Sequence, residues 1–397
     1  MKKWLFVSLT MVLIMSGCAP AFQKEEKVVE ENENKQGQTG IIPSFQVSED
    51  YYKVLLPFEE SAARGNVVTN INTRYDVVEF ETGLMRLAQS KFSPEKYVFR
   101  EGQKLDGETI KAWLSREYTE EQMEEYKMDK EDNLGLNPVL SEAEIKEKGF
   151  VQAHEDNPLY IAHVLEHDYF VKSEENAVKL AGMTIGIALN SVYYYRETKA
   201  DGTFYVKEHK VDKADRVKYG EKVAQEIVNR LRADEEISDI PIMVTLFDQQ
   251  KKSAVIPGNF ISSTFIDKGK TNISSWQDIN EKYYLFPSND AEEDHRDDWQ
   301  YFQNFKDDVE AYFPNFNGVI GTGFYRGDQL SDLKIEIPIQ FYGKAETIGF
   351  AQYLKGLIID HFPSYLSLQI SVTSVDGPEI LFVRDAGKEE PFVHIYE

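Results

Sequence analysis

Two neighbouring stretches decide the fold, YIAHVLEHDYFV at residues 160–171 and LAGMTIGIALNSVYYY at residues 180–195. Both are rich in β-branched and aromatic residues, which are enriched in strands. In the first stretch, Ile161, Leu165 and Tyr169 belong to a series that alternates with period two, the side-chain spacing of a strand. We therefore predict two long strands here, preceded by several short acidic helices.

Towards the C-terminus, the pattern becomes one amphipathic helix followed by two strands, three times over. The predicted helices cover residues 217–231, 299–313 and 348–358, and the predicted strands cover residues 241–247, 253–265, 319–326, 333–341, 366–373 and 380–383. Helix–hairpin alternation favours antiparallel sheets with helices packed on one face, the α+β class. We predict this fold class for two domains that follow a signal peptide and a disordered tether.

Chain length and a charge-dense segment indicate where the domains divide. At roughly 150 residues per domain, 397 residues suggest two or three domains. The segment at residues 207–218 is dense in charge, and we place the boundary there. The predicted parts are a lipoprotein signal peptide, an acidic disordered tether, an N-terminal α+β domain and a C-terminal α+β domain, at residues 1–17, 18–43, 44–210 and 211–397.

Composition excludes several classes of function. The chain has 44 Lys and Arg against 68 Asp and Glu, a formal net charge of −24. This balance argues against a nucleic-acid partner, which needs a basic footprint, and disfavours direct electrostatic docking onto anionic lipid. The single cysteine, Cys18, excludes an intramolecular disulfide and a cysteine-based zinc site.

The N-terminus has the organisation of an export signal. Two lysines at residues 2–3 form a positive region, and residues 4–15 are apolar except for one serine and one threonine. A stretch of this length fits the apolar core of a signal peptide, roughly 7–15 residues. It is shorter than the roughly 20 residues that a membrane-spanning helix needs.

The end of this signal resembles a bacterial lipobox. Met15, Ser16 and Gly17 precede Cys18, and their small or unbranched side chains suit recognition by a signal peptidase. The Cys18 thiol is expected to form a thioether to diacylglycerol, and cleavage before it frees an amine that palmitate or a similar fatty acid can acylate. Two or three acyl chains hold a protein stably on a membrane. We therefore expect the mature chain to be lipid-anchored on the extracellular face of the cytoplasmic membrane.

The segment after the signal reads KEEKVVEENENKQGQTG at residues 24–40. Only Val28 and Val29 are large and apolar, and no periodicity produces a face to bury. Such a composition predicts a disordered tether that holds an acidic domain away from the bilayer.

His163, Glu166 and His167 form an H-x-x-E-H pattern, which occurs in inverted zinc peptidases. That chemistry needs both histidines on one helical face, with the glutamate beside the metal-bound water. In the predicted strand, the two histidines would lie about 13 Å apart, too far to share one ion. A helix beginning at residues 157–158 stays open, so a wall-facing metal-dependent hydrolase is the alternative function. Our main prediction has no catalytic, cofactor-binding or metal residues.

Three weaker motifs also have functional interpretations. Residues 321–327, GTGFYRG, resemble a dinucleotide loop, but a strand pattern follows where that loop needs a helix. Six acidic residues within 290–298 suit calcium, although no EF-hand spacing is present. Tyrosine clusters occur at residues 51–52, 193–195 and 283–284. Because alternate strand residues face opposite sides, a ring of Tyr193–Tyr195 could be exposed and bind a cell-wall polymer or a peptide.

The whole chain resembles the CamS family of sex-pheromone lipoproteins from low-GC Gram-positive bacteria. The resemblance rests on the lipobox, the acidic tether, GNVVTNINTRYDVVEFETGLMRLAQSKFSPEKYVFREGQKL at residues 65–105 and FNGVIGTGFYRGDQLSDLKIEIPIQFYG at residues 316–343. It implies a surface lipoprotein without an established activity. It also implies that the cleaved signal is trimmed to a hydrophobic conjugation pheromone, here MVLIMSG at residues 11–17.

From these observations we predict a non-enzymatic binding or interaction module. Its expected partners are the lipid bilayer, through acylated Cys18, and a peptide or cell-wall ligand. No nucleic acid is expected among them.

Overall fold

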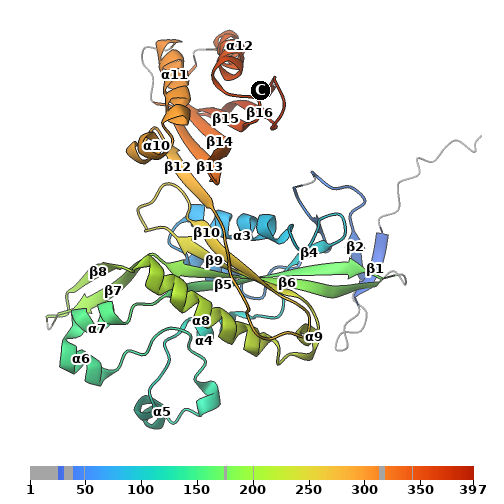
Figure 1. Cartoon of the computed structure of the whole chain (residues 1–397). Coiled ribbons are helices and arrows are strands. Elements are labelled where there is room, and N and C mark those ends of the chain that lie inside the picture. The colour runs from blue at the N-terminus through green and yellow to red at the C-terminus, as the bar shows by residue number, and fades with distance from the viewer. Residues whose placement is uncertain are drawn as a thin grey trace, which may run out of the picture.

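The computed structural model describes residues 26–30, 39–48, 50–173, 177–199, 201–312, 318–341 and 343–397. These residues form a large nine-stranded sheet, a six-stranded sheet and a separate two-stranded hairpin, with helices around the two larger sheets (Figure 1). The predicted α+β class with two sheet-based parts is therefore confirmed.

Runs of strands and runs of helices follow one another along the chain. The strands are β1 (Glu26–Glu30), β2 (Thr39–Ile42), β3 (Lys53–Val54), β4 (Val98–Glu101), β5 (Ile161–Lys172), β6 (Ala177–Asn190), β7 (Val192–Thr198), β8 (Phe204–Lys210), β9 (Ile242–Gln249), β10 (Asn259–Ile266), β11 (Gln277–Asp278), β12 (Glu281–Phe286), β13 (Ile320–Arg326), β14 (Gln329–Pro338), β15 (Ser367–Ser374), β16 (Gly377–Arg384) and β17 (Phe392–Ile395). The helices are α2 (Arg64–Asn70), α3 (Arg74–Ala88), α4 (Gly107–Leu114), α5 (Glu120–Tyr126), α6 (Glu142–Lys148), α7 (Phe150–Asp156), α8 (Lys213–Leu231), α9 (Glu235–Ser238), α10 (Asn289–Asp294), α11 (Arg296–Tyr312) and α12 (Lys344–His361), with a 3₁₀ turn at Lys130–Asp132.

The first predicted long strand is β5, whereas the second, predicted at residues 180–195, divides at Ser191 into β6 and the start of β7. Strands β5 and β6 form the centre of the large sheet and pair in antiparallel fashion. The strand order is β11-β10-β9-β6-β5-β4-β3, with β1 and β2 at one end of β6. Pairing is parallel between β6 and β9, between β3 and β4, and between β1 and β6. The sheet is therefore mixed, where the sequence predicted an antiparallel one.

The predicted domain boundary between residues 210 and 211 is wrong, because it cuts through this sheet. Strands β9 and β10 follow that boundary, yet β9 pairs with β6 along eight residues. The charged segment that suggested a linker is the end of β8 and the start of α8, where the Asp212 side chain accepts hydrogen bonds from the helix N-terminus. The residues of this segment are charged because they are largely solvent-exposed and because one of them caps a helix. The sheets divide instead between β11 and β12.

Helices cover both faces of the large sheet, which differs from the predicted single face. Val223 and Ile227 of α8 pack in one apolar cluster with Ile187 of β6. Phe80 of α3 packs in another cluster with Ala188, the next residue of β6. Because successive strand residues point to opposite faces, α3 and α8 lie on opposite sides of the sheet, as Figure 1 shows.

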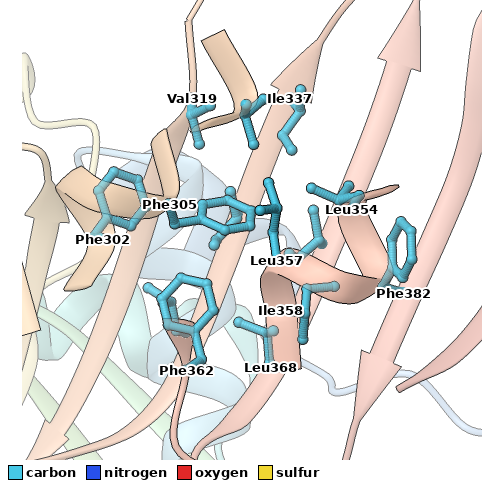
Figure 2. Packing of buried hydrophobic residues seen from close by; sticks show 14 of the residues in the cluster. Phe302, Phe305, Val319, Ile337, Leu354, Leu357, Ile358, Phe362, Leu368 and Phe382 are labelled. Carbon is cyan, nitrogen blue, oxygen red and sulfur yellow. The ribbon is translucent and has the colours of Figure 1, made fainter. Parts of the chain in front are cut away.

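The six-stranded sheet has its helices on one face, as predicted. Its order is β12-β13-β14-β15-β16-β17, and only the β14–β15 pair is parallel, because α12 connects these two strands. Figure 2 shows Phe302 and Phe305 of α11 beside Leu354 and Ile358 of α12, packed over residues of the sheet. This core is built from apolar side chains.

Part of the predicted tether is ordered. Strand β1 pairs with β2 and with β6, and Val28 is only 1% exposed, in a cluster with Ile42 and Leu55. One valine that fits an open sheet edge buries apolar surface even in an acidic segment, a contact that composition does not reveal. The prediction of disorder is therefore wrong for β1 and β2. The rest of residues 18–38 lies outside the described residues.

Side-chain caps define the ends of two short helices. Thr119 and Gln122 form the capping box at the start of α5, and Ser141 caps α6, which ends at Gly149. Within the part of the chain that the structure describes, we find no helix with the length and apolar character to span a bilayer.

Candidate functional site

The predicted lipidation residue Cys18 and the predicted signal peptidase residues Met15, Ser16 and Gly17 lie outside the described residues. The first described strand is β1, at one end of the large sheet. The hairpin of β7 and β8 lies at the other end of that sheet (Figure 1). Strand β1 and this hairpin therefore lie at opposite ends of the sheet.

The H-x-x-E-H residues lie on strand β5, which confirms the predicted strand. His163 is fully buried with its ring 6.4 Å from that of Phe80, and among the residues that the structure describes neither ring nitrogen has a hydrogen-bond partner. The His167 ring meets Phe99 edge-on at 4.9 Å. Among the described residues, no group of three or more His, Cys, Asp or Glu side chains could hold a metal ion. This geometry does not support the alternative of a zinc hydrolase.

Glu166 holds the loop that follows β4. Its carboxylate accepts hydrogen bonds from the backbone N–H of Leu105 at 2.7 Å and from that of Lys104 at 3.1 and 3.2 Å. A Cβ on Gly102 would lie 2.5 Å from the Glu166 side chain, so glycine permits this close approach. Both carboxylate oxygens are therefore engaged by the protein, and Glu166 has a structural role here.

Burial sets the protonation of this part of β5. It raises the pKa of Glu166, although the backbone N–H donors oppose the rise. Burial and the neighbouring Glu166 charge raise the pKa of Asp168 well above its usual value. Burial lowers the pKa of His163 to about 4 and that of His167 to about 3. Both histidines are consequently neutral at pH 7, a state that suits an interior position.

A small cavity adjoins His167. Its volume is about 70 Å³, and the ion pair between Arg64 and Glu101, 2.7 Å long, is part of its lining. Other lining side chains are Ser61, Val67, Glu81, Met85, Phe99, Leu165 and Glu166. Pockets for drug-sized ligands are several times larger, about 300–1,000 Å³. The cavity therefore does not fit a ligand of that size.

The glycine-rich motif belongs to a hairpin. Gly321 and Gly323 lie in β13, and Gly327 adopts a φ of 62° in the turn to β14. Left-handed backbone favours glycine, and the following element is a strand. The predicted strand-and-turn interpretation is confirmed, and the helix that a dinucleotide loop requires does not follow.

The acidic segment at residues 290–298 lies in α10 and the start of α11. Asp294 accepts a hydrogen bond from Tyr284 at 2.6 Å and pairs with Lys282 at 3.1 Å. Asp298 accepts a hydrogen bond from Tyr325 at 2.9 Å. Protein donors thus satisfy these carboxylates, and the geometry gives no support to a calcium site.

The tyrosine cluster on β7 shows the predicted alternation. Tyr193 and Tyr195 are buried against His154 of α7, with the Tyr195 ring stacked 4.8 Å from the histidine ring. Tyr194 is half-buried on the opposite side, where its hydroxyl oxygen accepts a hydrogen bond from the Lys252 backbone N–H at 3.1 Å. The well-exposed aromatic side chains are instead Phe204 and Tyr205 of β8.

The residue types at positions 204–206 favour a strand, but the exposure of Phe204 and Tyr205 is not evident from the sequence. Alternation of apolar and polar residues is the usual sign of a half-buried strand. Consecutive apolar residues at 204–206, directly after a turn, lack that alternation. A continuous apolar run is typical of a strand buried on both faces, so the sequence carries no signal of this exposure.

Comparisons with known proteins agree on one family. A family model described as the CamS sex pheromone cAM373 precursor matches residues 58–390. The chain is similar to the C-terminal domain of the sex pheromone staph-cAM373 precursor from Staphylococcus aureus, at 32% identity and a TM-score of 0.68, covering 83% of this chain and 98% of that one. It is also similar to a sex pheromone precursor from Lactobacillus salivarius, at 28% identity and a TM-score of 0.77, covering 89% and 98%. Among curated proteins, none matches this chain.

Proposed function

Since the chain belongs to the CamS family of sex pheromone precursors, we propose that it is a surface lipoprotein anchored through Cys18. The observation that supports this proposal most strongly is the order of residue types at the N-terminus. Positive residues, an apolar stretch and small residues precede the single cysteine in the order that lipoprotein export needs. The family assignment supports export, because a pheromone precursor has to release its peptide outside the cell.

The released signal is the proposed source of the pheromone. Residues 11–17, MVLIMSG, carry no charged side chain. A short apolar peptide of this kind can partition into a membrane and be captured by a receptor in a neighbouring cell. Cleavage before Cys18 would leave this heptapeptide at the C-terminal end of the signal.

The mature part would then act as a binding module without catalysis. Three observations support this: β5 carries the H-x-x-E-H motif as a strand, Glu166 is engaged by backbone N–H groups, and His163 is sealed in the core. Its proposed partners are the bilayer, through the acyl chains, and a cell-wall ligand.

The anchor is tested by replacing the acceptor thiol. Cys18→Ser should abolish lipid attachment and shift the protein from the membrane fraction to the medium or to an unprocessed form. Ser16→Ala is the matched control, because it keeps a small side chain before the cleavage site. Unchanged membrane retention of the Cys18→Ser protein would refute the anchor.

The pheromone is tested in culture filtrates. Mass spectrometry should detect MVLIMSG from cells with the natural chain and lose it when Cys18→Ser blocks processing. The synthetic heptapeptide should induce conjugation in recipient cells, whereas a scrambled peptide of the same composition should not. Absence of the peptide from filtrates of processing-competent cells would contradict the proposal.

The non-enzymatic assignment is tested by metal analysis of the purified chain beside its His167→Ala variant. We expect no stoichiometric zinc in either protein. One zinc per chain that disappears in the variant would favour the metal-dependent hydrolase.

A further inference from the structure

The hairpin of β7 and β8 is an isolated structural unit. Within the described chain, these two strands pair with each other and with no third strand. In Figure 1 the hairpin projects from the end of the large sheet that lies opposite β1. Strand β8 is solvent-exposed along nearly its whole length, with Phe204 at 53% and Val206 at 63% exposure.

One face of this hairpin combines aromatic rings with cations. The register pairs Arg196 with Val206 and Thr198 with Phe204, so Arg196, Phe204 and Val206 share a face with Tyr194. The Arg196 guanidinium carbon lies 4.1 Å from the centre of the Phe204 ring. The Lys252 ammonium lies 4.4 Å from the centre of the Tyr194 ring. We call the hairpin face the hairpin residues Tyr194, Arg196, Phe204 and Val206 together with Lys252 and its chain neighbour Lys251, which belong to the loop after β9.

The charge of this face is opposite to that of the chain. Arg196, Lys251 and Lys252 are exposed, and among the described residues no carboxylate lies within 4.0 Å of their charged groups. Glu208 is the acidic residue that shares the face by register. In a chain with a net charge of −24, exposed cations that no described carboxylate pairs with give a local positive potential that attracts anionic partners.

We propose that the hairpin face binds an anionic cell-wall polymer in which phosphate groups alternate with sugar or polyol units. The cations would contact the phosphates, and the exposed ring would pack against the hydroxylated units between them. This choice of partner rests on the proposed anchor, because a chain tethered through its N-terminus has β1 nearest the bilayer. The hairpin, at the far end of the sheet, is then directed away from the lipid headgroups and towards the wall.

Co-sedimentation with purified cell walls tests the proposal. The mature chain, residues 18–397 with Cys18→Ser and without the signal peptide, carries neither lipid nor the apolar signal and avoids adhesion through either. It should sediment with intact walls and remain in solution with walls from which hydrofluoric acid has removed the phosphodiester polymers. Retention should weaken as salt is raised, because screening reduces interactions between exposed charges.

Charge and ring variants locate the site. The triple variant Arg196→Glu, Lys251→Glu, Lys252→Glu should bind intact walls about tenfold more weakly, since charge complementarity is reversed. A control with the same change in net charge replaces three exposed lysines elsewhere, Lys130, Lys334 and Lys388, by Glu. Phe204→Ser should also weaken binding, whereas Phe392→Ser, at another exposed phenylalanine, should not.

Three outcomes would overturn the proposal: equal loss in the triple variant and its control, full retention on stripped walls, or preference for vesicles of phosphatidylglycerol over walls. Circular dichroism of each variant separates loss of binding from loss of folding. Because the tested chain carries no lipid, these results are independent of whether Cys18 is acylated. A failed lipidation test would likewise leave them unchanged.

Discussion

The large sheet and the six-stranded sheet differ in what they bury. The large sheet and its helices enclose many polar side chains, among them Asp76, Glu79, Arg100, Asn137, His163, Glu166, His167, Asp168 and Gln249. In the described part of the six-stranded sheet and its helices, Thr347 and Arg384 are the buried polar residues. The first interior depends on hydrogen bonds and protonation states, whereas the second depends on apolar packing. The two parts should therefore respond to different perturbations.

The largest expected effect is a cavity in the apolar core. Phe305 of α11 is fully buried and its ring lies 4.9 Å from that of Phe362 (Figure 2). Phe305→Ala should cost about 3–5 kcal/mol of unfolding free energy, because little polar structure can compensate. Urea denaturation should show this part of the chain unfolding first. Phe305→Leu serves as the milder control, and a loss below about 1 kcal/mol for the alanine variant would contradict the account.

Lowering the pH should destabilise the large sheet through its buried histidine. His163 has a pKa of about 4 in the folded chain and about 6.5 when unfolded, so the unfolded chain binds more protons between these values. The stability that neutral His163 contributes is present above pH 6.5 and is lost as pH falls towards 4. His163→Leu removes the titrating group and breaks no hydrogen bond among the described residues. As pH falls from 7 to 4.5, the unfolding free energy of the variant should rise by roughly 2–3 kcal/mol relative to that of the natural chain.

Denaturation at both pH values checks this difference between the two chains. Asp168 and Glu166, whose raised pKa values act in the opposite direction, are present in both chains and cancel. A difference that does not change with pH would show that His163 is not a buried neutral group.

Substitution of Arg86 tests the contact between the large sheet with its helices and the six-stranded sheet. Its Nη2 lies 2.8 Å from both Glu79 of α3 and Glu281 of β12. The Tyr283 hydroxyl donates to Glu79 at 2.6 Å. Arg86→Met should cost about 2 kcal/mol, since two largely buried carboxylates lose their partner. Hydrogen exchange in β12 should accelerate.

The matched control for this experiment is Arg326→Met. Arg326 is more exposed and lies 3.9 Å from Asp332, so the change should cost less than about 1 kcal/mol. Equal effects of the two variants would mean that the Arg86 cluster does not join the parts.

The smallest effect is expected at a surface helix that belongs to neither core. The Thr119 side chain accepts a hydrogen bond from the backbone N–H of Gln122 in the α5 capping box. Thr119→Ala should destabilise α5 by about 1 kcal/mol, seen as faster hydrogen exchange in Glu120–Tyr126 alone. Thr119→Ser keeps the hydroxyl and should preserve protection. Global destabilisation by the alanine variant would contradict a local role.

Local signals predicted much of this fold. Periodicity and residue type located β5 and most of β6, short helices were expected before them and are present, and the strand pattern around His163 argued correctly against a helical zinc motif. Long-range pairing was not predictable in this way. The parallel contact between β6 and β9 crosses the expected boundary, and burial of Val28 depends on an open edge of β6. Both depend on partners distant in sequence, which composition and periodicity do not specify.

For the candidate sites too, local features were predictable from the sequence and long-range features were not. Alternation predicted the opposite orientations of Tyr193 and Tyr194. The exposed ring of Phe204 was not predicted, because its exposure depends on β8 having no third strand beside the hairpin within the described part of the chain. The predicted Cys18 site depends on a local motif, and it stays a prediction until the mature N-terminus is measured.

That measurement is mass spectrometry of the mature N-terminal peptide from protein extracted from membranes. The account predicts a chain that begins at Cys18 and carries a diacylglyceryl thioether, with or without a fatty acid on the new amine. A mature chain that begins at another residue, or at an unmodified Cys18, would contradict it.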